Sequence, residues 1–314
     1  MAKVTFRIWR GDNRGGEFRN YSAEVGPGMV VLDAVLDIQQ AQANDLAVRW
    51  NCKAGKCGSC SAEINGMPKL LCMTRLSSLP LNKPIMVEPM RAFPLIKDLV
   101  TDVSWNFRVK EGIKPFRPSK PDLPDGAWRM AQADVDRVQE FRKCIECFLC
   151  QDVCHVLRNH HLYHKYAGPR YFVHDAALEM HPLDDQNRIR DIHNQHGIGY
   201  CNITKCCTQV CPAGILITDN AIIPLKERVV DEFYDRWQSC LRYSGFQADD
   251  STWRTKAFTA ALLTSQRRAY AAYKLTGPAI TKKGACEQTR GKGYAKSLAP
   301  RGDRAMALKP DACP

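Results

Sequence analysis

The chain lacks an apolar stretch long enough to cross a lipid bilayer. A membrane-spanning helix needs about 20 mostly apolar residues, whereas the longest candidates are residues 213–225, which polar side chains interrupt, and residues 258–263. A secretory signal is missing too, because residues 1–8 alternate between apolar and polar side chains like a strand. We therefore expect a soluble or peripheral protein whose 15 cysteines lie in a reducing compartment, without a disulfide framework.

Large apolar side chains are also scarce towards the C-terminus, where positive charge gathers. Residues 237–314 contain 14 Lys and Arg against 5 Asp and Glu, so +9 of the formal net charge of +12 lies there. This composition predicts a basic, disordered extension. Two roles stay open for it: contact with anionic lipid, to which each basic residue contributes roughly 1 kcal/mol, or a solvated segment without function. Its three cysteines are too far apart to form a cluster: Cys240, Cys286 and Cys313.

Cysteine, in contrast, is abundant, and two related runs stand out. The first run has the spacing Cys-x2-Cys-x2-Cys-x3-Cys, with Cys144, Cys147, Cys150 and Cys154. Bacterial ferredoxins use this spacing twice, and the fourth cysteine of each run binds the cluster of the other run. The second run keeps three of the four positions, with Cys201, Cys207 and Cys211. Thr204 stands where the remaining cysteine belongs.

Exchange of the fourth cysteines gives one complete and one incomplete ligand set. The complete set predicts a 4Fe-4S cluster bound by Cys144, Cys147, Cys150 and Cys211. The incomplete set predicts a 3Fe-4S cluster, because a cubane corner without a protein ligand loses its iron readily; its ligands are Cys154, Cys201 and Cys207. Cys206 is out of register, and only a rearranged backbone would make it a ligand. Two structural zinc sites are the alternative, but they need four ligands in pairs.

The N-terminal part predicts a β-grasp domain around a third group of cysteines. Residues 3–10 and 18–25 alternate as strands, and residues 29–43 repeat apolar side chains at helical spacing. A glycine-rich loop follows, and then a hairpin whose Asn65-Gly66 pair is typical of a type I′ turn. The plant-type spacing Cys-x4-Cys-x2-Cys, with a fourth cysteine beyond the hairpin, predicts a 2Fe-2S cluster bound by Cys52, Cys57, Cys60 and Cys72. Buried free cysteines are the alternative.

A proline-rich stretch separates these two parts. Four prolines between residues 114 and 124 predict an extended, semi-rigid linker. Apolar side chains recur at helical spacing before Cys144 and within residues 171–180 and 221–233, so we expect a mainly helical second domain. The predicted class is α+β: a plant-type 2Fe-2S ferredoxin-like β-grasp domain (residues 1–105), the linker (106–130), a helical bacterial-ferredoxin-like domain (131–236) and the basic extension (237–314).

Together these motifs resemble the iron-sulfur subunit of succinate dehydrogenase or fumarate reductase, the respiratory complex II family. The resemblance covers about residues 1–236 and rests on the plant-type loop, the segment Phe-Pro-Leu-Ile-Lys-Asp-Leu-Val at 93–100, and the seven-cysteine module. It implies a subunit that relays electrons from the FAD of a flavoprotein subunit through the 2Fe-2S, 4Fe-4S and 3Fe-4S clusters to a quinone at a membrane anchor. It also implies a peripheral position on the cytoplasmic face of a bacterial cell membrane. The resemblance does not decide whether the anchor contains haem b.

The motifs supply thiolates and no combination of Arg, His and Asp typical of a dicarboxylate site. We therefore expect no catalytic residue and no substrate chemistry in this chain alone, and no nucleic-acid partner. The direction of electron flow stays open, because succinate oxidation and fumarate reduction use the same series of clusters. An alternative from another class is a soluble multi-cluster ferredoxin, or an adaptor subunit of another oxidoreductase.

Three positions depart from the resemblance. Ubiquinone-reducing members usually carry Pro, Trp and His near the third cluster, where this chain has His155, Asn159 and Asn202. These residues are the candidates for the vicinity of the quinone, and the departure is compatible with a menaquinone-using branch. His155 has two interpretations, a proton donor to the quinone or a histidine without a redox role. The region contains three further histidines, His160, His161 and His164. Their spacing does not favour a metal site, and the alternative is that they contact the membrane anchor.

Overall fold

A seven-stranded sheet forms around the first strand, β1 (Ala2–Asp12). Val4, Phe6 and Ile8 alternate along this strand and are almost completely buried, as expected for a strand with one face in a core. The computed structural model describes residues 2–121 and 124–234. The extension predicted for residues 237–314 lies outside the described residues.

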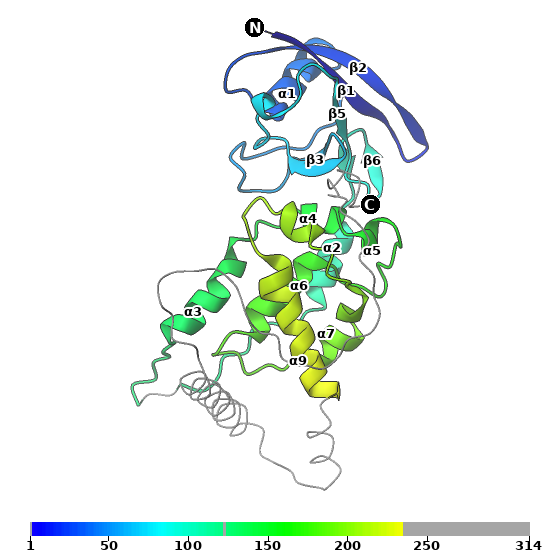
Figure 1. The fold of residues 1–314 in the computed structure, drawn as a ribbon. Coiled ribbons are helices and arrows are strands. Elements are labelled where there is room, and N and C mark those ends of the chain that lie inside the picture. Colours follow the sequence, from blue (N-terminus) through cyan, green and yellow to red (C-terminus); the bar gives the residue numbers. More distant parts are fainter. Residues whose placement is uncertain (1, 122–123, 235–314) are drawn as a thin grey trace, which may run out of the picture. The chain divides into compact units, whose positions relative to one another are not determined.

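The strand pairing gives the mixed sheet of a β-grasp fold (Figure 1). β2 (Gly15–Val25) pairs antiparallel with β1, and β5 (Ile85–Glu88) pairs parallel with it. β3 (Ser61–Ile64) pairs antiparallel with both β4 (Met67–Leu70) and β5. Two short strands, β6 (Leu95–Lys97) and β7 (Val100–Thr101), follow β1 in the sheet order. The two predicted N-terminal strands are confirmed and are longer than predicted.

A helix of the first domain packs on this sheet. α1 (Val31–Ala41) buries Val35 and Ile38, which lie on the same side of the helix, in the core with β1. Its first turn is stabilised by Asp33, whose carboxylate accepts a hydrogen bond from the Val30 N–H (3.1 Å). The predicted helix is thus confirmed, and its end leads directly into the cysteine loop.

The predicted linker is not extended throughout. α2 (Ser104–Glu111) forms its first part, with Asn106 fully buried and Trp105 packed against the cores on both sides. Further along, the buried Arg188 donates to the carbonyl oxygen of Pro115 (2.6 Å) and holds the proline-rich segment. The extended conformation was predicted for residues 114–124, and the described part of that stretch, residues 114–121 and 124, contains no helix. The helix α2 was not predicted, and side chains buried between the domains stabilise it. The domain boundaries themselves stay a prediction.

The second domain is helical, as predicted, and encloses its own apolar core. Its longest helices are α6 (Pro169–Glu179), which begins with a proline, and α9 (Ile223–Tyr234), which continues from the π-helical turn η4 (Ile217–Ile222). The shorter elements are α3 (Gln132–Gln139), η2 (Glu140–Lys143), α4 (Leu149–Asp152), α5 (His155–Arg158), α7 (Ile189–Asn194), η3 (Ile198–Tyr200) and α8 (Cys206–Gln209). A further 3-10 turn, η1 (Leu76–Ser78), belongs to the first domain. Among the described residues, none of the helices has the length and apolar character to cross a membrane.

Buried polar groups join the two domains near their cysteines. The Ser61 hydroxyl on β3 donates to the backbone carbonyl of Cys147 (2.8 Å). The buried Glu63 carboxylate, also on β3, accepts from Arg158 of α5 (2.9 Å). Buried polar groups are costly unless they are paired, so these bonds help to hold the first domain at this part of the helical domain.

Candidate iron-sulfur sites

The loop between α1 and β3 folds its backbone around the first predicted ligands. The Lys56 N–H donates to Cys52 Sγ (3.2 Å), and the Cys52 N–H donates to Cys57 Sγ (3.5 Å). Donors aimed at a sulfur favour its thiolate form. The pKa of Cys57 is lowered to about 6, above all by a hydrogen bond from the Ser59 side chain. The loop is therefore suited to thiolates, the form in which cysteine binds iron.

The hairpin of β3 and β4 brings the fourth predicted 2Fe-2S ligand to the same loop. Cys60 precedes β3 and Cys72 follows β4, so antiparallel pairing places them at the same end of the hairpin. The turn has left-handed φ values at Asn65 (51°) and Gly66 (78°), which confirms the type I′ prediction. Burial raises the pKa of Cys60 to about 12, and the charge of Cys72 adds to this. Bound iron would compensate such charges, because a coordinating thiol is deprotonated.

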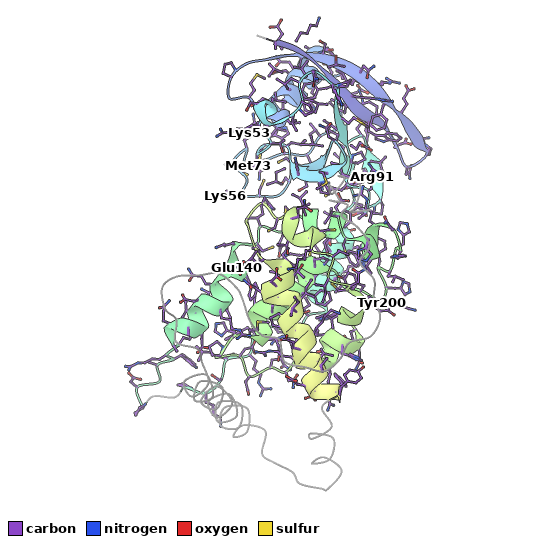
Figure 2. The ribbon with its side chains drawn as sticks, in the orientation of Figure 1. Lys53, Lys56, Met73, Arg91, Glu140 and Tyr200 are labelled. Carbon is purple, nitrogen blue, oxygen red and sulfur yellow. The ribbon has the colours of Figure 1, made fainter. Side chains whose placement is uncertain are left out.

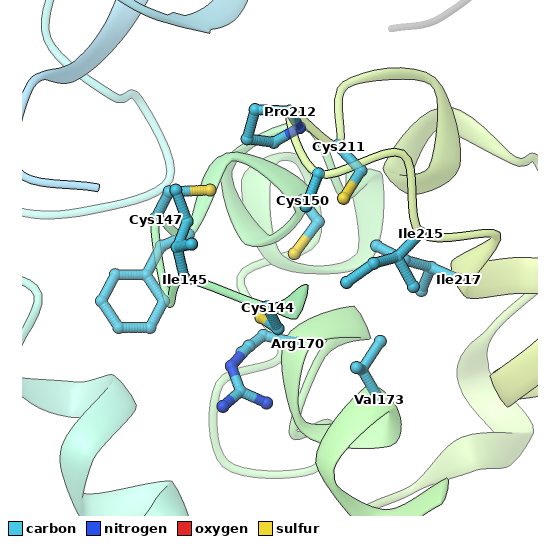
Figure 3. A pocket seen from close by; sticks show the side chains of 12 residues that line it. Cys144, Ile145, Cys147, Cys150, Arg170, Val173, Cys211, Pro212, Ile215 and Ile217 are labelled. Carbon is cyan, nitrogen blue, oxygen red and sulfur yellow. The ribbon is translucent and has the colours of Figure 1, made fainter. Parts of the chain in front are cut away.

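Four cysteines from both runs line one cavity in the helical domain (Figure 3). They are the set predicted for the 4Fe-4S cluster: Cys144, Cys147, Cys150 and Cys211. Ile145, Val173 and Ile217 contribute apolar walls. Burial raises the pKa of Cys147 to about 12 and that of Cys150 well above its usual value. Four thiols in an apolar cavity fit a bound cluster, whose iron would supply the positive charge that thiolates need there.

A cation lies at the same cavity. Arg170, on α6, lines it beside Cys144 (Figure 3). Its buried guanidinium is held by the Glu146 carboxylate (2.6 Å), while its Nε has no hydrogen-bond partner among the described residues. Burial disfavours the charge, but Cys144 and Glu146 outweigh this, and the pKa of Arg170 is raised. Sequence patterns did not single out Arg170, because it lies outside both cysteine runs.

The cysteines predicted for the 3Fe-4S cluster gather elsewhere, near the hydroxyl of Tyr166. The Sγ atom of Cys154 is 3.9 Å from the hydroxyl oxygen. The charges of all three cysteines of this set act on the hydroxyl: Cys154, Cys201 and Cys207. Cys207 Sγ also lies 3.4 Å from Thr218 Oγ1. Burial raises the pKa of Cys154 to about 11. The fold thus brings these side chains together, and their binding of a cluster stays a prediction.

The two cysteine runs repeat one backbone conformation. Glu146 and Phe148 in the first run have left-handed φ values of 54° and 62°. Ile203 and Lys205, at the equivalent positions of the second run, have values of 63° and 64°. A β-branched residue such as Ile203 adopts this conformation rarely. In both runs a 3-10 turn precedes the first cysteine and a short helix follows the second left-handed residue. Thr204 therefore occupies the backbone position of Cys147.

The surroundings of these two equivalent positions differ. Cys147 is buried, and a Cβ atom added to Gly58 would come within 2.6 Å of its Cα atom, so the 2Fe-2S loop packs directly on it. Thr204 is exposed. Cys206 is equivalent to the buried Leu149 rather than to a ligand, and its sulfur lies 3.9 Å from the Thr204 carbonyl oxygen. Spacing alone could not show which of the two positions is enclosed.

Two of the three candidate quinone residues are neighbours on α5: the Asn159 N–H donates to the His155 carbonyl oxygen (2.9 Å). Asn159 and Asn202 are exposed, and the half-buried His155 has its ring centroid 6.0 Å from that of His160. Burial, and then the charge of His160, lowers the pKa of His155. Within the part of the chain that the structure describes, no three or more His, Cys, Asp or Glu side chains are arranged to hold a single metal ion.

Comparisons with known proteins cover both cysteine-containing domains. Residues 5–108 match the family described as a 2Fe-2S iron-sulfur cluster binding domain, and residues 140–215 match the 4Fe-4S dicluster domain. These matches agree with the α+β arrangement of two ferredoxin-like domains. The second match spans both cysteine runs, and Thr204 lies within it, between Cys201 and Cys207.

Curated relatives and a solved structure extend over both domains. The chain is 34% identical over 208 residues to the fumarate reductase iron-sulfur subunit of Mycobacterium tuberculosis, covering 63% of this chain and 80% of that protein. It is 29% identical over 204 residues to the succinate dehydrogenase iron-sulfur subunit of Bacillus subtilis, covering 61% and 78%. A chain of the Mycobacterium smegmatis Sdh1 complex in the apo form is 56% identical, with a TM-score of 0.72 and coverage of 74% of this chain and 98% of that chain.

Proposed function

Because the chain belongs to the family of fumarate reductase and succinate dehydrogenase iron-sulfur subunits, we propose that it is the electron-transfer subunit of a membrane-bound succinate:quinone oxidoreductase. In this role it relays electrons between the FAD of a flavoprotein subunit and a quinone at a membrane anchor. Iron-sulfur clusters supply one-electron transfer at potentials set by cluster type, hydrogen bonds and burial. The proposal is supported above all by the cavity that three cysteines of one run and one of the other line, as expected for the crossed ligand set of a two-cluster ferredoxin.

The chain's part in this function is to hold three clusters. We assign the 2Fe-2S cluster to Cys52, Cys57, Cys60 and Cys72, the 4Fe-4S cluster to Cys144, Cys147, Cys150 and Cys211, and the 3Fe-4S cluster to Cys154, Cys201 and Cys207. These eleven cysteines are free of disulfide bonds. Thr204, on the backbone position of Cys147, offers a hydroxyl in place of a thiolate, and this supports three irons rather than four at the third site.

The surface around the first cysteine loop supports a flavoprotein partner. Trp50 and Met73 are exposed there, and the Lys53 ammonium lies 4.6 Å from the centroid of the Trp50 ring. Figure 2 shows Lys53, Lys56 and Met73 projecting from this region. Exposed aromatic and Met side chains are typical of interface centres, so we assign this surface to the subunit that delivers or accepts electrons at the flavin.

The surface around the second cysteine run supports a membrane anchor. Tyr200 and Ile203, on either side of Cys201, are exposed large apolar side chains, at 47% and 39%. We assign them to the contact with the anchor, and we retain His155, Asn159 and Asn202 as candidates near the quinone. This contact would hold the chain at the cytoplasmic face of the membrane.

Purification of the native complex from membranes tests the proposal. We expect a flavoprotein with FAD and an anchor subunit to accompany the chain, and succinate-dependent quinone reduction by the complex. Quinol-dependent fumarate reduction as the faster reaction would assign the reverse direction. Isolation as a soluble monomer would support a ferredoxin instead. The chain freed of flavoprotein should not oxidise succinate with an artificial acceptor, and activity there would overturn the assignment.

A further inference from the structure

Tyr166 is a buried phenol held in one orientation beside the second group of cysteines. It lies just before α6 and is 1% exposed. Its ring packs on Phe172, with the ring centroids 5.5 Å apart. Its backbone N–H donates to the Leu162 carbonyl oxygen (3.0 Å), and the next residue, Ala167, donates to the carbonyl oxygen of His196 (2.9 Å). These contacts fix both the backbone and the ring of Tyr166. Because the hydroxyl oxygen is attached rigidly to the ring, its position is fixed as well.

The hydroxyl faces sulfur. Among the described residues, the polar atom in contact with it is Cys154 Sγ, 3.9 Å from the oxygen. A buried tyrosine hydroxyl usually has a hydrogen-bond partner. A cysteine that binds iron has lost its proton, so in this contact the hydroxyl is the donor and the Cys154 sulfur is the acceptor.

We propose that the Tyr166 hydroxyl donates a hydrogen bond to the Cys154 thiolate and thereby raises the reduction potential of the cluster held by Cys154, Cys201 and Cys207. The inference rests on the proposed function and adds a residue that tunes its last site. Reduction adds one electron and increases the negative charge on the sulfurs, and a donor stabilises the more negative form. Hydrogen bonds to sulfur are among the factors that set the potential of an iron-sulfur cluster. Burial strengthens the effect, because a hydrogen bond in a low-dielectric surrounding is stronger than in water.

Tyr166→Phe removes this hydroxyl and keeps the ring. The purified complex is titrated with redox mediators while the cluster signals are followed by electron paramagnetic resonance. We expect the midpoint potential of the 3Fe-4S signal to fall by the equivalent of a roughly three- to tenfold change in the reduction equilibrium, a tenfold change being about 59 mV for one electron. The midpoints of the 2Fe-2S and 4Fe-4S clusters should keep their wild-type values.

Tyr171→Phe is the matched control. Tyr171 is also 1% exposed, but its hydroxyl donates to the backbone carbonyl of Asn106 rather than to sulfur. This variant should leave the 3Fe-4S midpoint unchanged. An unchanged midpoint in Tyr166→Phe, or an equal shift of all three clusters, would overturn the inference while leaving the proposed function intact. A wild-type complex without any 3Fe-4S signal would instead overturn the proposed function.

A second substitution covers the case in which Tyr166→Phe loses the cluster. Incorporation of a fluorinated tyrosine at position 166 keeps the hydroxyl and makes it a stronger donor, so the 3Fe-4S midpoint should rise. Pulsed resonance on the oxidised wild-type cluster should also detect an exchangeable proton that disappears in deuterium oxide. An unchanged or lower midpoint with the fluorinated residue contradicts the role of the hydroxyl.

Discussion

The two cysteine runs of the helical domain have the same backbone conformation but differ in their burial by neighbouring residues. Cys147 and Thr204 stand at the same place, each between two residues in the left-handed conformation. Cys147 is buried beneath Gly58 of the first domain, whereas Thr204 is exposed. The repeated backbone thus sets the positions of the side chains, while the neighbouring domain decides which position is enclosed.

The polar side chains beside the two groups of cysteines differ as well. A guanidinium, that of Arg170, lies beside the four-cysteine cavity. A neutral hydroxyl, that of Tyr166, lies beside the three-cysteine group. Charges and hydrogen bonds near a cluster both shift its potential. The same cysteine spacing can therefore support two sites with separate potentials.

We expect the largest effect from a substitution that removes the difference between the two runs, namely the cysteine that the second run lacks. Thr204→Cys places a thiol on the backbone position of Cys147, so the second site should gain one iron and its potential should fall. Quinone reduction should then slow. Iron analysis and electron paramagnetic resonance check this, since an oxidised 3Fe-4S cluster is paramagnetic and an oxidised low-potential 4Fe-4S cluster is silent.

Gln209→Cys is the control for the added thiol, because Gln209 is exposed in the same run but out of ligand register. It should leave the iron content unchanged. If the wild-type protein, prepared without oxygen, already lacked the 3Fe-4S signal and held the extra iron, then the assignment of three ligands would be wrong.

The cover over Cys147 is tested by Gly58→Ala. A Cβ atom there meets the Cys147 backbone at 2.6 Å, and the residue has a φ of 69°. Gly66→Ala is the matched control, because Gly66 also has a left-handed φ but an added Cβ meets nothing within 4 Å. We expect Gly58→Ala to destabilise the protein by about 1–3 kcal/mol more than the control. Denaturation of both complexes, followed through loss of the 2Fe-2S signal, gives the difference, and equal midpoints would show that the loops are not in contact.

We expect a moderate effect on the 4Fe-4S potential from removal of the positive charge of Arg170. Arg170→Gln should lower the 4Fe-4S potential by about 59 mV, a roughly tenfold change in the equilibrium, because the cation stabilises the more negative, reduced form. Arg170→Lys should restore part of the loss. Arg190→Gln, which removes a charge at the exposed surface, should have no effect on this potential. A redox titration in which the Arg170→Gln midpoint equals that of wild type would exclude a tuning role.

The smallest effect is expected from the basic extension. Truncation after Arg236 removes no assigned ligand, so all three cluster signals should persist with wild-type intensities. The spectra of the truncated complex check this directly. Loss of any one cluster would mean that the extension contributes to cluster binding or to its protection.

Elements with local signals were predictable. β1, β2, α1 and the Asn65-Gly66 turn follow from alternation, helical spacing and turn chemistry, which depend on neighbours along the chain. α2 was missed, because the prolines that follow it dominated the local pattern. That helix depends on the burial of Asn106 and Trp105 between the domains, a condition that no local signal contains.

The same distinction holds for the sites. Cysteine spacing was enough to predict three ligand sets and the missing thiolate at Thr204, because ligation needs cysteines at set separations along the chain. Spacing could not predict the contact of Gly58 with Cys147, the position of Arg170 beside Cys144, or the hydroxyl of Tyr166 beside Cys154. Each of these pairs joins segments that are separate in the sequence. Packing alone brings such segments together, and packing therefore decides how each cluster site is covered and which charges and donors surround it.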